Sequence, residues 1–248
     1  GSGMGRELTL ELVRRGSKVA AIDMRQETLN ETAKLAGKNV ETFLLDVTNR
    51  AEVAAIPAKV SSKMGEVDVL INNAGIIQPF VKINDLTFEQ AEKVMNVNFY
   101  GPFAMIKAFL PGLLTRPAAH ILNVSSMGAY APVPGQSVYG ASKAAVKLLT
   151  EGLRSELLGT NVGVTVVFPG AVATNISTNS GLAMPANADA QNSQFKSLPA
   201  PIAAKKMIDA IESGKPRITI GRDAKTMDRL SRLNPVFAAN LIYKQMKS

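Results

Sequence analysis

Short apolar runs alternate with longer helical segments along most of this 248-residue chain. Runs that read as buried strands occupy residues 18–23, 40–46, 67–71, 120–125, 163–168 and 217–220. The segments between them have the length and apolar spacing of helices, and this alternation is typical of a parallel sheet with helices on both faces. The sequence therefore predicts an α/β fold in which residues 1–248 form a single domain, with a doubly wound parallel sheet as the middle of three α/β/α layers.

Polar residues stand where four of the predicted strands end. They are Asp23, Asp46, Asn73 and Ser126. The carboxyl ends of parallel strands meet at one edge of a sheet, and the binding sites of such sheets lie at that edge. We therefore expect a functional site there.

The first five residues are rich in glycine and lead into a helix predicted over residues 6–16. They are Gly1, Ser2, Gly3, Met4 and Gly5. Glycines ahead of a helix let backbone N–H groups approach a phosphate at the positive helix end. The alternative is a flexible leader without a binding role.

Asp23 follows Gly5 by 18 residues, close to the spacing at which a nucleotide-binding fold places a carboxylate on the adenosine ribose hydroxyls. A carboxylate at this position repels a 2′-phosphate, so we expect the cofactor to be NAD rather than NADP. Arg25 is the neighbouring residue that argues for NADP. The alternative role of Asp23 is that of an N-cap or turn residue.

Tyr139 and Lys143 lie four residues apart in a helix predicted over residues 137–158, so their side chains share one helical face. An ammonium beside a phenol favours phenolate, and we expect it to lower the pKa of Tyr139. Ser126, 13 residues before Tyr139, follows a strand end and offers a hydroxyl to the same substrate oxygen. These groups suit proton transfer coupled to hydride transfer at a carbonyl.

A second Tyr–Lys pair provides an internal comparison. Tyr243 and Lys247 have the same spacing, but Leu230 stands 13 residues before Tyr243 and no apolar strand leads into it. A Tyr–Lys pair at this spacing is ordinarily a surface pair, and we interpret Tyr243 in this way. The neighbours of Tyr139 are what favour a chemical role for it.

Two further polar residues stand in apolar surroundings. Thr87 and Gln90 form a capping box for a long helix that carries Asn98 and is predicted to bend at Pro102. Asn98 needs a hydrogen-bond partner, because an unbonded amide in an apolar helix is costly. His120 begins a strand, at the end opposite the expected site, and we interpret it as structural.

The composition excludes several classes of site. The chain has no Cys and one His, which rules out disulfides and thiol nucleophiles and leaves no residues for a Cys- or His-based metal centre. We therefore expect no metal. No apolar run of about 18 residues and no secretory signal is visible, so a cytoplasmic protein is expected. No motif points to nucleic acid.

The net charge of +8 is concentrated near the carboxyl end, where residues 201–248 hold ten Lys or Arg against four Asp or Glu. We interpret residues 222–248 as a basic C-terminal tail with a solubilising face. Its apolar residues Phe237, Leu241 and Ile242 could dock on an anionic membrane, but core packing or a subunit interface is the favoured explanation.

Residues 175–200 are rich in Ala, Asn, Ser and Pro and show little periodicity. A loop of this length in a compact domain is usually functional or disordered, and we predict a substrate lid with Leu182 and Met184 as pocket residues. The apolar residues Phe80, Met127 and Tyr130 also lie near the expected pocket. Their types favour a lipophilic substrate.

Taken together, these motifs resemble the short-chain dehydrogenase/reductase family in its single-domain form. The resemblance covers essentially the whole chain and rests on motifs in family order: Asn72-Asn73-Ala74-Gly75, Asn98, Asn123-Val-Ser-Ser126, Tyr139-x-x-x-Lys143 and Pro169-Gly170-x-Val172-x-Thr174. It implies a Rossmann-like fold and a homodimer or homotetramer.

The resemblance also implies residue roles. Tyr139 would be the general acid/base, Lys143 would hold the nicotinamide ribose, and Ser126 would orient the substrate oxygen. Asn98 would support a water-linked proton relay. The residues implied to bind the cofactor are Gly1, Ser2, Gly3, Met4, Gly5, Asp23, Asp46, Val47, Asn73, Ala74, Gly75, Tyr139, Lys143, Pro169, Gly170, Val172 and Thr174.

One departure from the family pattern concerns the start of the chain. The pattern begins with a strand and Thr-Gly-x-x-x-Gly-x-Gly, of which only the last five positions, Gly1 to Gly5, are present. The absent strand would be central in a doubly wound sheet. We expect that either the chain is shortened relative to the functional protein, or its nucleotide site is compromised. We favour the first interpretation.

The sequence thus predicts an NAD(P)-dependent oxidoreductase that interconverts a secondary alcohol and a ketone, with Tyr139 as acid/base. The alternative is a non-catalytic nucleotide-binding regulator or scaffold on the same fold. The complete set of Asn98, Ser126, Tyr139 and Lys143 argues against that alternative, since such a protein need not keep the acid/base.

Overall fold

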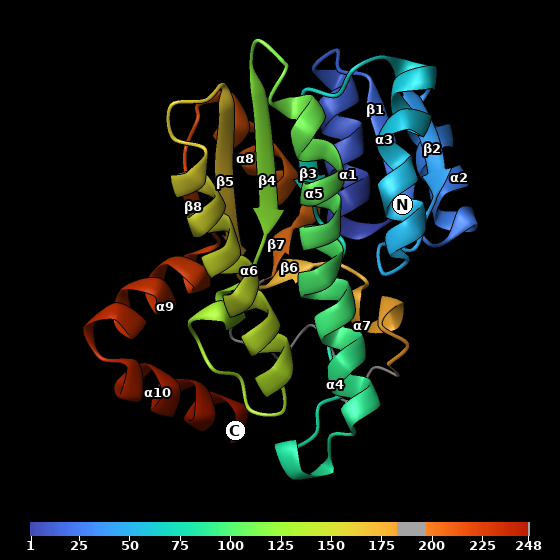
Figure 1. Ribbon diagram of the computed structural model, residues 1–248. Helices are drawn as coiled ribbons and strands as arrows, with labels where there is room; N and C mark the ends of the chain where they lie inside the picture. Colours follow the sequence, from blue (N-terminus) through green and yellow to red (C-terminus); the bar gives the residue numbers. More distant parts are fainter. Residues whose placement is uncertain (183–196, 248) are drawn as a thin grey trace.

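The computed structural model describes residues 1–182 and 197–247 and contains the predicted parallel sheet (Figure 1). Its main strands are β1 (Val19–Asp23), β2 (Val40–Leu44), β3 (Val69–Asn72), β4 (Ala119–Val124), β5 (Val162–Pro169) and β8 (Arg217–Ile220). Every ladder between them is parallel. The strands agree with the apolar runs of the sequence to within a few residues at each end.

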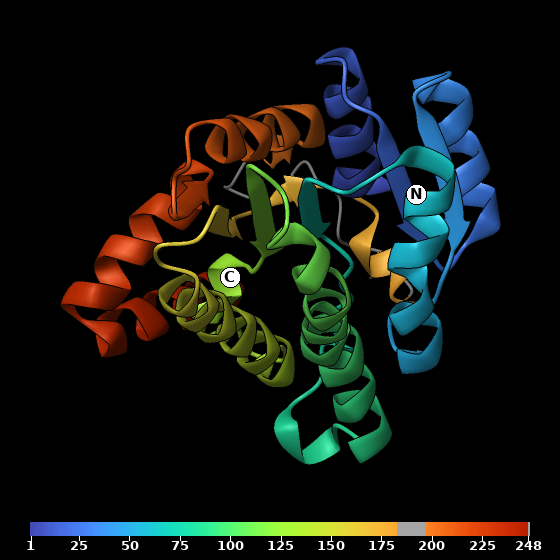
Figure 2. The same cartoon turned by 45° about the horizontal axis from the view of Figure 1, so that its top comes forward.

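Helices cover both faces of the sheet, as Figure 2 shows. The covering helices are α1 (Gly3–Arg14), α2 (Gln26–Ala36), α3 (Arg50–Met64), α5 (Gly101–Leu113), α6 (Ser137–Glu156) and α8 (Ala200–Glu212). Helices α1 and α8 pack together on one face, and α3, α5 and α6 pack on the other. This arrangement confirms the doubly wound three-layer fold. Helix α1 begins at Gly3, three residues before the predicted start.

The hydrogen-bonded ladder of the sheet is interrupted between β1 and β3. Within residues 1–182 and 197–247, the strand order is β2–β1 in one part and β3–β4–β5–β8 in the other. The direction of winding also reverses at this point, because the chain passes outward from β1 to β2 and then crosses to β3. The interruption falls where the family pattern has its central first strand.

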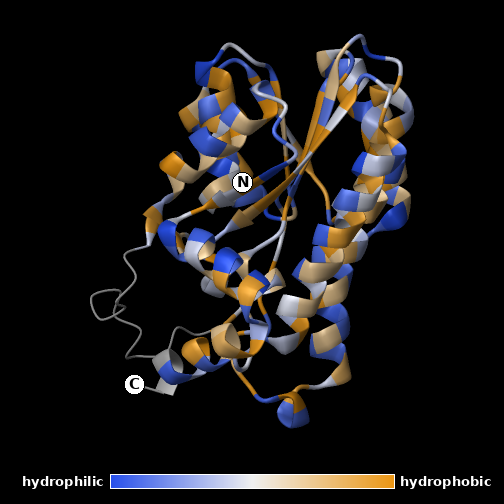
Figure 3. Ribbon diagram, turned by 90° about the vertical axis from the view of Figure 1, so that its left-hand side faces the viewer, coloured by the Kyte–Doolittle hydropathy of each residue, from blue (hydrophilic) through white to orange (hydrophobic). Residues whose placement is uncertain are grey.

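Apolar side chains from the sheet fill two core layers. On one face, Ile121 of β4 packs with α3, α5 and the end of α6. On the other face, Leu122 of the same strand packs with α1 and α8. The side chains of Ile121 and Leu122 are both fully buried. In Figure 3 the central strands are largely hydrophobic, whereas the flanking helices carry both hydrophobic and hydrophilic residues.

His120 lies in this core at the start of β4. Its side chain is buried, and its Nε2 lies 2.7 Å from Oγ1 of Thr165 on the neighbouring strand β5. Burial lowers the pKa of His120, so the ring is neutral at physiological pH. The structural interpretation of His120 is therefore confirmed.

The long helix predicted around Asn98 has three parts. Helix α4 (Phe88–Met95) starts at the predicted capping box, in which both Thr87–Gln90 hydrogen bonds form. A π-helical turn, η2 (Asn96–Tyr100), then leads into α5. The π turn ends two residues before Pro102, which lies in the first turn of α5. The predicted bend at Pro102 stays a prediction.

The segment interpreted as a basic tail forms two helices. Helix α9 (Arg222–Leu233) and helix α10 (Pro235–Lys247) follow β8, and they lie beyond the carboxyl ends of the strands in Figure 1. Ile242 is buried in a small cluster with Ala131, Met227 and Ala238, Leu241 packs against this cluster, and Phe237 is half exposed. Packing therefore accounts for two of the three apolar residues considered for membrane docking.

Shorter elements lie near the carboxyl edge of the sheet. They are η1 (Ile83–Asp85), η3 (Met127–Ala129), β6 (Val172–Ala173), α7 (Ile176–Asn179) and β7 (Leu198–Pro199), with β6 and β7 paired in parallel. Part of the predicted lid, including Met184, lies outside the described residues, so the lid stays a prediction. No helix in the described ranges is long and apolar enough to cross a membrane.

Candidate active site

The four candidate catalytic residues come from three elements that meet at the carboxyl edge of the sheet. Ser126 follows β4 and precedes the short helix η3. Tyr139 and Lys143 lie in the first two turns of α6, and Asn98 lies in the π turn η2. Helix α6 contacts both η3 and η2, so the fold brings together side chains that are up to 45 residues apart in sequence.

Two glycines allow η3 to lie close to α6. A Cβ on Gly128 would stand 3.3 Å from Cε1 of Tyr139 and 3.5 Å from Oγ of Ser126. A Cβ on Gly140 would stand 3.0 Å from the carbonyl oxygen of Gly128. Because both positions lack a side chain, the phenol of Tyr139 comes close enough to the hydroxyl of Ser126 for the two groups to interact.

Lys143 is almost completely buried below this pair. Its ammonium donates a hydrogen bond to the carbonyl of Val124 at 3.1 Å and lies 6.0 Å from the centroid of the Tyr139 ring. A Cβ on Gly75 would stand 3.1 Å from Nζ of Lys143 and 3.4 Å from Oδ1 of Asn98. Gly75 thus occupies the space between the two polar side chains.

Asn98 is fully buried and all of its polar atoms are bonded. Its Oδ1 accepts a hydrogen bond from the amide of Ile76 at 2.9 Å. Its Nδ2 donates to the carbonyl of Ile76 at 2.9 Å and to Oγ of Ser142 at 3.0 Å. The expectation that Asn98 needs partners is confirmed, and the partners fix the loop that follows β3.

The expected lowering of the Tyr139 pKa is wrong. Desolvation raises the pKa of Tyr139 above its ordinary value, and the hydrogen bond with Ser126 opposes this only in part. Desolvation also lowers the pKa of Lys143 to about 8. Burial prevails because the ammonium is itself desolvated and stands 6.0 Å from the phenol ring.

The residues predicted to hold a nucleotide also converge. A Cβ on Gly3 would stand 3.4 Å from Cβ of Thr174, and a Cβ on Gly5 would stand 3.0 Å from Nδ2 of Asn73. The Oδ1 of Asn73 is buried and has no hydrogen-bond partner in the structure. Glycines without side chains at the start of α1, next to an unpartnered amide oxygen, suit a polar ligand such as a dinucleotide.

Asp23 ends β1 and faces the amino end of the chain. Its Oδ2 accepts a hydrogen bond from the N-terminal ammonium of Gly1 at 2.9 Å, and its Oδ1 accepts one from the amide of Arg25 at 3.0 Å. The guanidinium of Arg25 donates to Asn179 at 2.7 Å and to Oγ of Ser2 at 3.3 Å. The side chains of Asp23 and Arg25 therefore both lie beside Gly1 and Ser2, where the adenosine ribose is expected.

The remaining predicted cofactor residues lie along the same edge. Asp46 follows β2 and holds its own turn by accepting from the amide and hydroxyl of Thr48, each at 2.9 Å. Its neighbour Val47 packs closely against Gly101. Met4 lies in the first turn of α1, Ala74 follows β3, Pro169 and Gly170 stand at the end of β5, and Val172 begins β6.

Three residues that support the site were not predicted from the sequence. Ser142 bonds Asn98, and the carboxylate of Asp223 accepts from the amide of Ala171 at 2.7 Å while abutting Gly170. Gln78 is fully buried in the loop after β3. A lone polar residue within the apolar stretch from Ile76 to Phe80 was the available signal for Gln78.

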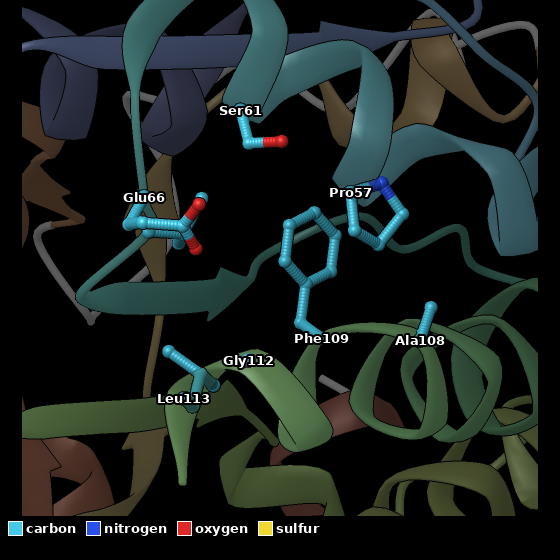
Figure 4. A pocket seen from close by; sticks show the side chains of 8 residues that line it. Pro57, Ser61, Glu66, Ala108, Phe109, Gly112 and Leu113 are labelled. Atoms are coloured by element: carbon cyan, nitrogen blue, oxygen red, sulfur yellow. The ribbon is translucent and has the colours of Figure 1, made fainter. Parts of the chain in front are cut away.

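Two cavities lie away from these residues. One, of about 90 Å³, opens between α3 and α5, where Pro57 and Phe109 stand near Glu66 (Figure 4). Glu66 precedes β3, so this cavity lies at the amino ends of the strands, opposite the candidate site. The other, of about 390 Å³, lies beside α6 and α9, and its charged side chains pair with one another.

Comparison with known proteins places this geometry in a family. The sequence model described as short chain dehydrogenase matches residues 1–184. The chain belongs to the short-chain dehydrogenase family. As a member of this family, it is an oxidoreductase of the dehydrogenase type.

Three proteins illustrate how short-chain dehydrogenases resemble this chain. A Mycobacterium tuberculosis protein named as an oxidoreductase, SadH, is 35% identical over 247 residues, which cover 94% of this chain and 87% of the relative. The NADP-dependent 3-hydroxy acid dehydrogenase YdfG of Shigella flexneri is 36% identical over 171 residues, 69% of each chain. A solved short-chain dehydrogenase/reductase from Burkholderia phymatum, in complex with NAD, has a TM-score of 0.83 at 27% identity and covers 92% of this chain and 89% of its own.

Proposed function

We propose that this chain interconverts a secondary alcohol and a ketone, with Tyr139 as the acid/base. The observation that carries the proposal is the contact between the Tyr139 phenol and the Ser126 hydroxyl at the carboxyl edge of the sheet, above the buried ammonium of Lys143. A bound nicotinamide dinucleotide supplies the hydride chemistry. The residues of the chain supply the proton and the orientation of the substrate.

Tyr139 donates a proton to the substrate oxygen during reduction and accepts it during oxidation. The raised pKa of Tyr139 keeps the phenol protonated and so ready to donate. The Ser126 hydroxyl hydrogen-bonds the same substrate oxygen and holds the carbonyl towards Tyr139. Lys143, with a pKa of about 8, is mostly cationic at neutral pH and stabilises phenolate as it forms.

Residues at the start of α1 and at the ends of β1, β3 and β5 would hold the nucleotide. The support for this is the pair of glycines, Gly3 and Gly5, next to the unpartnered Oδ1 of Asn73. We expect NAD to be preferred, because the Asp23 carboxylate repels a 2′-phosphate. Arg25 borders the same place and opposes this preference. The related proteins include one named for NADP and one solved with NAD.

The substrate class is argued from the loop that follows Ser126. Met127 and Tyr130 are partly buried there and pack against α9 and α10, whereas Phe80 is 59% exposed at the rim. The apolar residues Met127 and Tyr130, close to Ser126 in sequence, support a lipophilic secondary alcohol as the substrate. The name of the Shigella relative adds 3-hydroxy acids as a class to be tested.

A coenzyme-linked screen tests the proposed function. The chain is incubated with NADH or NADPH and a panel of 2-ketones and 3-oxo esters of increasing chain length, and coenzyme oxidation is followed by absorbance. We expect turnover that improves with chain length. Nucleotide binding without turnover across the panel would instead favour the non-catalytic regulator or scaffold.

The homodimer or homotetramer expected from the sequence stays a prediction.

A further inference from the structure

Gln78 is a buried glutamine that joins two parts of the candidate site. It stands three residues after Gly75 in the loop that follows β3, and its side chain is 1% exposed. A buried amide destabilises the fold unless its donors and acceptor are bonded. The partners of Gln78 therefore show what its burial achieves.

The side chain of Gln78 bonds the start of the helix that carries Tyr139. Its Oε1 accepts hydrogen bonds from the amides of Val138 at 2.8 Å and Tyr139 at 2.9 Å. Its Nε2 donates to the carbonyl of Gly135 at 3.0 Å. The backbone carbonyl of Gln78 also accepts from Nε2 of Gln136 at 2.7 Å. Four hydrogen bonds thus join Gln78 to residues 135–139.

Helix α6 lacks a side-chain cap of its own. The first N–H groups of a helix have no acceptor within the helix and are ordinarily satisfied by the side chain of the N-cap residue. The N-cap residue of α6, Gln136, makes no such bond. Gln78, about 60 residues earlier in the chain, supplies the acceptor instead.

The loop that carries Gln78 is itself held in place. Asn98 bonds both the amide and the carbonyl of Ile76, two residues before Gln78. Gly75 in the same loop lies against the ammonium of Lys143. The loop after β3 therefore sets the position of the Tyr139 backbone relative to Lys143 and Asn98.

We propose that Gln78 is a positioning residue that caps α6 from the loop after β3 and holds the Tyr139 phenol at the Ser126 hydroxyl. This inference rests on the proposed acid/base role of Tyr139. Gln78 itself does not touch the substrate oxygen. Without its Oε1, the amides of Val138 and Tyr139 are left unbonded, and the first turn of α6 loosens.

The test compares Gln78→Met with Gln136→Met. Both glutamines are buried and both bond across the same two segments, but the side chain of Gln78 alone accepts from the Val138 and Tyr139 amides. Gln78→Met should lower kcat on the order of 10- to 100-fold while changing the KM for nucleotide less than about threefold. Gln136→Met should keep kcat within about threefold of the wild type.

Conservative variants separate positioning from general destabilisation. Gln78→Glu keeps an acceptor oxygen for the Val138 and Tyr139 amides but loses the donor to the Gly135 carbonyl, and should recover part of the kcat lost in Gln78→Met. Gln78→Asn keeps the amide but withdraws it by one carbon, and serves if Gln78→Met does not fold. An unchanged kcat in the Met and Asn variants, or an equal loss of kcat in Gln136→Met, overturns the proposal.

Two readouts do not depend on turnover. Amide exchange by NMR should be at least about tenfold faster for Val138 and Tyr139 in Gln78→Met, with the amide of the buried Leu153, about four turns later in α6, unchanged. Ultraviolet titration, with Tyr139→Phe as the reference, should place the Tyr139 pKa below its wild-type value, because the loosened turn exposes the phenol. If the wild type lacks turnover, the proposed function fails, but these two readouts still test whether Gln78 caps α6. Unchanged amide exchange together with an unchanged Tyr139 titration overturns the capping proposal.

Discussion

Burial acts in opposite directions on the two titratable residues of the candidate site. It raises the pKa of Tyr139 and lowers that of Lys143 to about 8, because in each case the uncharged form is favoured in a poorly solvated place. The sequence could predict that these two residues are neighbours. It could not predict how deeply each is buried, and burial decides the sign of both shifts.

Lys143 should make the stability of the protein depend on pH. The pKa of Lys143 is about 8 in the folded protein against 10.5 when exposed, so between these values the unfolded chain binds more protons. The free energy of unfolding then rises with pH across this window, by up to about 3 kcal/mol. Urea denaturation of the wild type and Lys143→Met should show the wild type gaining stability relative to the variant from pH 8 towards pH 10. Parallel pH dependence in the two proteins would contradict the buried ammonium.

Nucleotide preference should follow the balance between Asp23 and Arg25. Fluorescence titration should show NADH binding more tightly than NADPH by about tenfold, which corresponds to ~1.4 kcal/mol. Asp23→Asn should reduce this difference, because it removes the charge that repels a 2′-phosphate. Tighter binding of NADPH by the wild type would mean that Arg25 prevails over Asp23.

Motif residues and supporting residues differ in how far the sequence reveals them. Asn98, Ser126, Tyr139 and Lys143 carry recognisable spacings, and the fold brings them together. Gln78 has no such spacing, because its partners lie about 60 residues away and are backbone amides. Contacts of this kind depend on tertiary structure and leave only a weak trace in sequence, here a glutamine between apolar neighbours.

Among the elements, the segment α4–η2–α5 shows what local signals can predict. The capping box at Thr87 was predicted because it depends on residues three apart. The π turn at 96–100 was not, since the extra residue that it accommodates is stabilised by the bonds of Asn98 to Ile76 and Ser142. Tertiary bonds to one buried amide thus outweigh regular helix geometry.

Thr87→Ala should lower the free energy of unfolding by about 1 kcal/mol. The Oγ1 of Thr87 accepts from the amide of Gln90 at 3.2 Å, and the Gln90 side chain bonds back to the Thr87 amide at 3.1 Å. Urea denaturation measures the change, with Thr115→Ala, which alters an exposed Thr without a capping box, as the comparison. Equal stability of Thr87→Ala and the wild type would show that the cap contributes nothing.

Helices α9 and α10 show a second limit of sequence reasoning. Their many Lys and Arg residues suggested a solvated tail, yet Met227, Ala238 and Ile242 form a small core with Ala131. The bidentate pair of Arg217 with Asp228 further ties α9 to β8. Small apolar residues spread among charged ones give only a weak periodic pattern. Their packing partner, Ala131, lies in the distant loop after Ser126, which the pattern of α9 and α10 does not reveal.

Across the whole molecule, the main strands follow from the sequence, and the interruption of the sheet falls where the chain lacks the first strand of the family pattern. Every main strand was predicted because strands in a parallel sheet are short apolar runs. Apolar runs alone do not indicate which strands pair, so the missing hydrogen bonds between β1 and β3 could not be predicted from them. In the described residues, β1 pairs with β2 alone and β3 pairs with β4 alone.

Hydrogen exchange should reveal the unpaired edge of β1. The amide of Val19 bonds towards β2, and since N–H groups alternate along a strand, those of Ala20 and Ile22 point the other way. We expect these two amides to exchange at least about tenfold faster than that of Ala21 in the same strand, and that of Ile121 in β4 to be among the slowest. Equal protection of Ala20 and Ala21 would mean that another partner covers this edge.

The acid/base role of Tyr139 is tested most directly by comparing Tyr139→Phe with Tyr243→Phe. Both tyrosines have a lysine four residues later, but Tyr139 alone lies beside Ser126 and Lys143, whereas Tyr243 is 48% exposed in α10. With the best substrate of the screen, Tyr139→Phe should lower kcat by about 100-fold or more while nucleotide affinity is retained, and Tyr243→Phe should match the wild type. Turnover by Tyr139→Phe at the wild-type rate would contradict the account.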